Sequence, residues 1–183
     1  YQATLMMLRA GARVVATTRF PVDAAARFSR ESDFAQWGHR LQVFGLDLRH
    51  IPSVEIFSRY LCSTLDRLDI LINNAAQTVR RPPGFYAHLL EAELAAPETL
   101  PEAVRGLLAQ SEACKNQLAT LSAATPQTAD AASLVVFPSQ GPGIGLRASA
   151  SLSQVPYAYD RSIHAEEIFP QGKLDADLQQ MDL

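Results

Sequence analysis

The first half of the chain alternates between short β-branched runs and longer segments with helical spacing, and this alternation constrains the fold more than any other feature. Three such runs cover residues 13–18, 41–46 and 68–72. Each is almost continuously apolar, which is typical of strands covered by helices on both faces. Strands that are separated by helices usually pair in parallel, because a parallel connection needs a crossover segment. The pattern therefore predicts a parallel α/β sheet.

Glycine, proline and aspartate mark where the predicted elements begin and end. Gly11 stands where a left-handed C-terminal cap would end a first helix over residues 2–9. Pro21 ends the first strand, and Asp23 is suited to cap a helix over residues 24–30. The next helix begins at residues 52–53 and carries an apolar stripe: Val54, Phe57, Leu61 and Leu65.

The balance of charge changes near the middle of the chain. Residues 1–91 hold eleven bases and eight acids, a balance of +3, whereas residues 92–183 hold five bases and eleven acids, a balance of -6. We therefore predict an α/β part over residues 1–91, followed by an irregular, mostly helical and Ala/Pro/Ser-rich insertion that is partly disordered. Helices are expected over residues 85–94 and 101–121, and a fourth strand over residues 134–137.

Composition narrows the classes of function. A net charge of -3 and a pI near 5.8 argue against binding of nucleic acid through bulk charge. The sequence has no run of eighteen apolar residues and no secretory signal pattern, which predicts no membrane partner. Two cysteines, Cys62 and Cys114, favour a reducing, cytoplasmic location. The four histidines lack the spacing of a metal site: His39, His50, His88 and His164.

Residues 5–81 resemble the short-chain dehydrogenase/reductase family at three successive places. These are similar to the family's second strand, its adenine-contacting acid and its Asn-Asn-Ala-Gly turn, and here they read Gly11-Ala12-Arg13-Val14-Val15, Leu46-Asp47-Leu48 and Asn73-Asn74-Ala75-Ala76. The resemblance implies an incomplete, Rossmann-like doubly wound parallel sheet that binds NAD(H) or NADP(H). It also implies hydride transfer between that cofactor and a small-molecule alcohol or carbonyl substrate in a longer parent protein, and leaves a homo-oligomer open.

In an open parallel sheet, ligands bind beyond the carboxyl ends of the strands, where the strand order reverses. The predicted cofactor-binding residues therefore stand where the three strands end: Thr18, Arg19, Asp47, Leu48, Asn73, Asn74, Ala75 and Ala76. No catalytic residue and no metal ligand is assigned in this chain.

The first two strand ends point to a particular cofactor. Asp47 can accept a hydrogen bond from the adenine amino group, although it can equally cap a helix or pair with Arg49. NAD-specific sites usually place an acid at the position that Arg19 occupies. A guanidinium there would instead pair with a 2'-phosphate, which favours NADP(H) over NAD(H). The alternative for Arg19 is a side chain that extends along the sheet edge without a ligand.

The third strand end carries two amides and two small residues. Asn73 and Asn74 can brace the turn and bind a ribose, while Ala75 and Ala76 allow a cofactor to approach closely. Ala76 stands where the family usually has glycine, and its methyl group would narrow the pocket. The alternative is a simple Asx turn without a ligand.

The family's catalytic pair is absent from this sequence. No tyrosine is followed four residues later by lysine, and the nearest approach is Tyr157 with Arg161. The Gly-rich pyrophosphate turn would lie immediately before the helix over residues 2–9, where this sequence has no residues for it, and the glycines of residues 140–145 are interrupted by Pro142. We therefore interpret the chain as an inactive internal piece of an oxidoreductase. The alternative is a non-catalytic nucleotide-binding or protein-interaction module.

Overall fold

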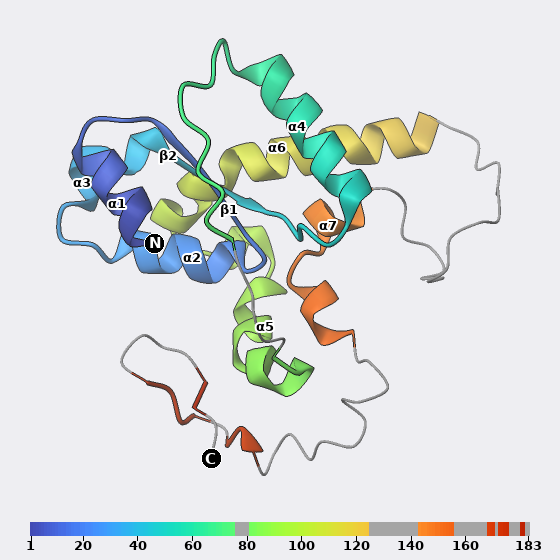
Figure 1. Cartoon of the computed structure of the whole chain (residues 1–183). Helices are drawn as coiled ribbons and strands as arrows, with labels where there is room; N and C mark the ends of the chain where they lie inside the picture. The colour runs from blue at the N-terminus through green and yellow to red at the C-terminus, as the bar shows by residue number, and fades with distance from the viewer. Residues whose placement is uncertain (76–80, 125–142, 156–167, 171, 176–179, 182–183) are drawn as a thin grey trace.

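The computed structural model describes residues 1–75, 81–124, 143–155, 168–170, 172–175 and 180–181. In this part of the chain the elements are, in order, α1 (Gln2–Arg9), β1 (Val14–Thr18), α2 (Pro21–Ser29), α3 (Phe34–Trp37), η1 (Gly38–Arg40), β2 (Leu41–Gly45), α4 (Ile51–Thr64), η2 (Pro83–Tyr86), α5 (Ala87–Glu93), η3 (Pro97–Thr99), α6 (Glu102–Ala124), α7 (Ile144–Arg147) and η4 (Ser151–Gln154) (Figure 1). The fold is mixed α/β and mostly helical.

The sheet of the described residues consists of two parallel strands. Val14 of β1 lies opposite Leu41 of β2, and Thr18 lies opposite Gly45. The backbone N–H of Leu46 donates to the carbonyl of Thr18 at 2.8 Å, which extends the pairing past the last residue of β2. The chain returns from the end of β1 to the start of β2 through α2, α3 and η1, as a parallel pair requires. The first two predicted strands and their parallel pairing are confirmed.

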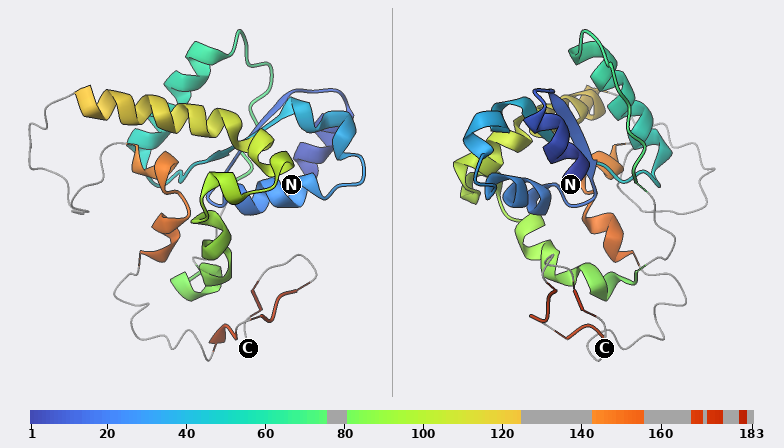
Figure 2. Two further views of the ribbon diagram at one scale, coloured as in Figure 1. Left: turned by 180° about the vertical axis from the view of Figure 1, so that it is seen from behind. Right: turned by 60° about the vertical axis from the view of Figure 1, so that its left-hand side comes forward.

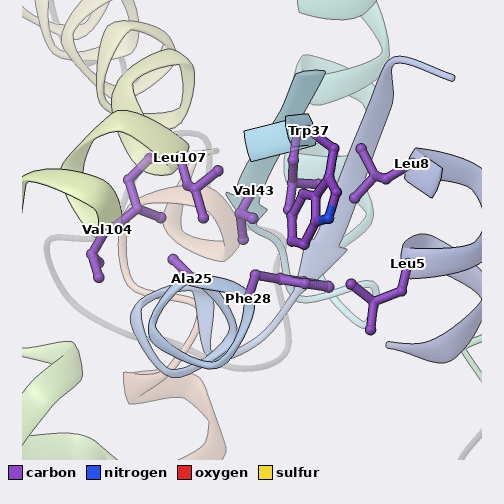
Figure 3. Close-up of a cluster of buried hydrophobic side chains, with 10 residues drawn as sticks. Leu5, Leu8, Ala25, Phe28, Trp37, Val43, Val104 and Leu107 are labelled. Carbon is purple, nitrogen blue, oxygen red and sulfur yellow. The ribbon is translucent and has the colours of Figure 1, made fainter. Parts of the chain in front are cut away.

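Alternate residues of β2 belong to two hydrophobic clusters, because successive side chains of a strand point to opposite faces. The first cluster gathers side chains from α1, α2, α3, β2 and α6: Leu5, Leu8, Ala25, Phe28, Trp37, Leu41, Val43, Val104, Leu107 and Leu108 (Figure 3). The second lies under α4: Phe44, Leu46, Phe57, Tyr60, Cys114 and Leu146. The two strands thus lie between α4 on one side and α2 on the other, and α6 contributes side chains to both clusters (Figure 2).

Helix α6 belongs to the acidic second part of the chain and packs against the first part. Val104 and Leu107 are each 2% exposed and pack in the same cluster as Val43 of β2. Residues on both sides of the predicted boundary at residue 91 therefore share one core. The helices predicted over residues 85–94 and 101–121 are present as η2 with α5 and as α6.

The ends of the first two helices differ in how well the sequence predicted them. Gly11 has φ 96°, the left-handed conformation predicted for it after α1. Helix α2, however, begins at Pro21 rather than after Asp23, and Phe20 is its N-cap. Proline is suited to the first helical position because its missing N–H would have no partner there. Asp23 lies in the first turn and is not the cap.

The third predicted strand is wrong in this structure. Residues 66–75 form neither strand nor helix. Four large apolar side chains of this segment are between 55% and 72% exposed: Leu68, Ile70, Leu71 and Ile72. A β-branched run becomes a strand only when a neighbouring strand accepts its hydrogen bonds and packs its side chains. Because β1 and β2 pair only with each other, the described sheet supplies no such neighbour to this segment.

Some predictions fall outside the described residues. These are the strand over residues 134–137, the first three residues of the glycine-rich stretch over residues 140–145, the pair of Tyr157 and Arg161, and Ala76. Where the structure describes the chain, no helix combines the length and the apolar character needed to cross a bilayer.

Candidate functional site

The structure brings two of the three predicted strand ends together. Thr18 pairs with Gly45 in the sheet, so Arg19 and Asp47 follow neighbouring strand ends. The Thr18 hydroxyl accepts a hydrogen bond from the backbone N–H of Phe20 at 3.1 Å, which turns the chain into α2. The Ser149 hydroxyl donates to the carbonyl of Arg19 at 2.9 Å. The end of β1 is therefore held from two directions.

A cavity of about 380 Å³ lies at this end of β1. Its walls come from the end of β1, from α2, and from the η2–α5 segment, which packs beside α2 (Figure 1). The polar and charged lining residues are Thr18, Arg19, Asp23, Arg27, Arg81 and His88. Three half-buried arginines against one aspartate give the cavity an excess of positive charge, which favours an anionic ligand.

Aromatic rings hold the arginines in place. The Arg19 guanidinium lies 4.7 Å from the ring centre of Tyr86, and its Nη2 donates to the Tyr86 hydroxyl at 2.8 Å. The Arg81 guanidinium lies 4.8 Å from the ring centre of Phe85, and that of Arg27 lies 5.0 Å from the ring of Tyr1. A stacked guanidinium keeps its planar donors available at its edge and loses less side-chain entropy when it binds an anion.

Asp47 is buried and pairs with a neighbour in sequence. Its residue is 1% exposed, and its carboxylate accepts hydrogen bonds from the Arg49 backbone N–H at 2.9 Å and from Arg49 Nη2 at 2.5 Å. Burial of Asp47 acts to raise the pKa of its carboxyl group, but the hydrogen bonds from Arg49, with a smaller contribution from Arg19, outweigh it and lower that pKa. Of the roles considered from sequence, pairing with Arg49 is present. Leu48 beside it is 47% exposed.

The third predicted strand end does not line the cavity. Asn73, Asn74 and Ala75 are exposed on the segment that forms no strand, and the backbone N–H of Asn74 donates to the carbonyl of Ile72 at 3.1 Å. Contact of these residues with a cofactor remains a prediction. Ala76 lies outside the described residues.

A half-buried carboxylate links the two helices of the cavity wall. Glu93, at the end of α5, accepts a hydrogen bond at 2.9 Å from the backbone N–H of Asp23 in the first turn of α2. Burial raises the pKa of the Glu93 carboxyl group to about 7, although the hydrogen bonds from the backbone of Asp23 and Val22 oppose that rise.

Sequence reasoning missed most of the residues that surround Arg19. Arg27 could have been found, because it follows Asp23 by four residues and so shares a helix face with it. Tyr86, His88 and Glu93 could not, since no local pattern places α5 against α2. Arg81 was not among the predicted cofactor-binding residues either, although it lines the cavity. The described residues contain no group of three or more His, Cys, Asp or Glu side chains that could hold a metal ion.

The likeness of this chain to known proteins is partial. No family model matches the chain, and no solved structure matches it. An uncharacterized protein of Acanthamoeba polyphaga mimivirus is 39% identical over 87 residues, which cover 43% of this chain and 18% of the viral protein. The chain thus spans about a fifth of the length of that relative.

Proposed function

We propose that this chain is the NAD(P)-binding portion of an oxidoreductase similar to the short-chain dehydrogenases/reductases, and that it prefers NADP(H) to NAD(H). The observation that carries the proposal is the position of Arg19, at the end of β1 in a cavity that Arg27 and Arg81 also line. A guanidinium offers two parallel N–H donors to a phosphate, and this geometry suits a 2'-phosphate better than a 2'-hydroxyl.

The same proposal covers a larger sheet and the reaction of the parent protein, and both rest on the sequence resemblance. The pair β1–β2 would be part of a larger, Rossmann-like doubly wound sheet. The parent protein would transfer hydride between NADP(H) and an alcohol or carbonyl. This chain alone would be inactive, because its sequence holds no Tyr-x-x-x-Lys pair. A cytoplasmic location is proposed with it, since Cys62 and Cys114 are both free thiols.

Calorimetric titration of the chain with NADPH and with NADH tests the proposal. We expect NADPH to bind at least tenfold more tightly, and Arg19→Ala to remove most of that difference, because a hydrogen bond to a charged group contributes about 1.5–3 kcal/mol. Arg59→Ala is the matched control, because the Arg59 side chain is 79% exposed on α4. Equal affinity for NADPH and NADH, or no binding of either, would contradict the proposal.

A second candidate is a non-catalytic protein-interaction module. It is favoured by the apolar segment of residues 68–72, because exposed apolar runs of this kind often mark contact surfaces. Hydrogen exchange of this segment at low and high protein concentration separates the two candidates. Protection that grows with concentration, in a chain that binds neither dinucleotide, would favour the interaction module.

A further inference from the structure

His88 carries two buried ring nitrogens that have no hydrogen-bond partner among the described residues. The residue lies in the first turn of α5 and lines the cavity at the end of β1. An unpaired polar group in a protein interior costs about 1–3 kcal/mol, so such groups are uncommon and usually have a functional reason. His88 therefore needs an explanation, and the cavity that it lines suggests one.

The charges around His88 favour an anion. The positively charged residues of the cavity wall are Arg19, Arg27 and Arg81, and its negatively charged residue is Asp23. Asp23 and His88 lie close enough to interact electrostatically, and burial raises the pKa of the Asp23 carboxyl group. A multiply charged anion among three arginines would outweigh one carboxylate. An imidazole N–H would then add a donor from α5.

The ring can reach the cavity without a movement of the backbone. A half-turn about the bond between Cβ and Cγ exchanges the positions of ring nitrogens and ring carbons, and histidine adopts both orientations readily. His88 is half-buried although both nitrogens are covered, so it lines the cavity with other atoms in the orientation described. A ligand that accepts a hydrogen bond would favour the orientation that presents a nitrogen to it.

We propose that His88 is a specificity-determining residue, which donates a hydrogen bond to a phosphate monoester bound by Arg19 in this cavity. For a dinucleotide, this rests on the proposed preference for NADP(H), and the phosphate would be the one on the 2' position. For inorganic phosphate, the inference rests on the residues of the cavity alone. Within the part of the chain that the structure describes the ring nitrogens have no partner, and the ligand would supply one.

Two variants and one control test the proposal. His88→Phe removes both nitrogens and keeps a planar ring, whereas His88→Gln keeps a donor. His39→Phe makes the same change at an exposed position of η1. Each protein is titrated with NADPH, with NADH and with inorganic phosphate, and its thermal unfolding without ligand is recorded.

We expect His88→Phe to weaken NADPH binding about tenfold and leave NADH binding unchanged. The same variant should raise the unfolding temperature of the unliganded protein, because it removes the unpaired polar atoms. A residue with a purely structural role would not lower affinity while raising stability. His88→Gln should keep NADPH affinity within about threefold of the wild type, and His39→Phe should change neither quantity.

The remaining outcomes separate this inference from the proposed function. If the wild type prefers NADPH and His88→Phe binds it equally well, the inference is wrong and the proposed function stands. If the wild type binds inorganic phosphate but no dinucleotide, and His88→Phe weakens phosphate binding, the proposed function fails and the inference stands. If the wild type binds none of the three probes, both fail. If His88→Phe does not fold, His88→Gln alone tests the inference. A loss of NADPH selectivity in His88→Gln would then show that the His88 side chain does not act as a hydrogen-bond donor to the phosphate.

Discussion

The Asp47 carboxylate is held by Arg49, two residues further along the chain, through the Arg49 backbone N–H and through its guanidinium. Asp47 is 1% exposed, whereas the Arg49 side chain is 44% exposed, so one partner is buried and the other reaches solvent. The pKa of Asp47 in the folded protein lies below its ordinary value. The pair therefore stabilises the fold above the ordinary pKa of 3.8, and this contribution is lost as the pH falls through the lower, folded-state pKa.

Arg49→Ala should lower the free energy of unfolding at pH 7 by about 2 kcal/mol, because it leaves a buried carboxylate without its charged partner. Urea unfolding measures this change. Arg59→Ala breaks an exposed ion pair with Glu55 and should change the free energy of unfolding by less than about 0.5 kcal/mol. Equal effects of the two substitutions would show that the Asp47 pair does not stabilise the fold.

The raised pKa of Glu93 predicts that stability depends on pH. Its folded-state value of about 7 lies above the ordinary 4.5, so between these values the folded protein binds more protons than the unfolded chain. The contribution of Glu93 to the free energy of unfolding should therefore be fully present below pH 4.5 and fall by roughly 3 kcal/mol as the pH rises through 7.

Glu93→Gln should remove this fall, because the amide oxygen still accepts the Asp23 N–H but carries no charge. Urea unfolding at pH 5 and at pH 8 gives the comparison. Glu98→Gln is the control, since Glu98 is exposed on η3 and should leave the pH dependence as in the wild type. A wild-type fall that persists in Glu93→Gln would mean that another group titrates in this range.

Tyr86→Phe tests whether the tyrosine positions Arg19. The substitution keeps the stacked ring and removes the hydroxyl that accepts from Arg19. We expect NADPH affinity to fall about threefold to tenfold while NADH affinity is unchanged, because Arg19 is less firmly placed for the phosphate. Tyr60→Phe is matched to it: Tyr60 is also 8% exposed and donates to Gln110 at 3.0 Å. Both variants should lose about 1 kcal/mol of stability, but only Tyr86→Phe should change the NADPH preference.

Leu71→Lys tests the conformation of the segment that forms no strand. Leu71 is 72% exposed, so the substitution should change the free energy of unfolding by less than about 0.5 kcal/mol. In a strand covered on both faces, a buried lysine at this position would cost several kcal/mol. Denaturant unfolding distinguishes an exposed segment from a buried strand. A large destabilisation would show that residues 68–72 are paired and covered in solution.

Local sequence predicted the elements whose apolar pattern and end signals agree. The runs that became β1 and β2 were found because both are short, apolar and followed by a break in pattern. Gly11 was found because a left-handed cap costs glycine little. The short helix α3 was missed, although its Trp37 is 1% exposed, because four residues carry no measurable period.

The candidate site was predicted in part. Thr18 and Arg19 line the cavity, and Asp47 follows the neighbouring strand end, as the positions of the strands indicated. The partners of Arg19 could not be predicted, because Tyr86 stands 67 residues further along the chain and reaches it only when α5 packs against α2.

By itself, the sequence determined where the chain changes direction and which side chains seek a core, because these depend on backbone preferences and on apolar surface that each segment carries with it. Only the tertiary structure decided whether an apolar run has a partner. Residues 41–45 became a buried strand beside β1, whereas residues 68–72 remained exposed, although both are apolar enough to form one. Strand hydrogen bonds and side-chain burial are shared between two segments, so the sequence of one segment cannot settle either.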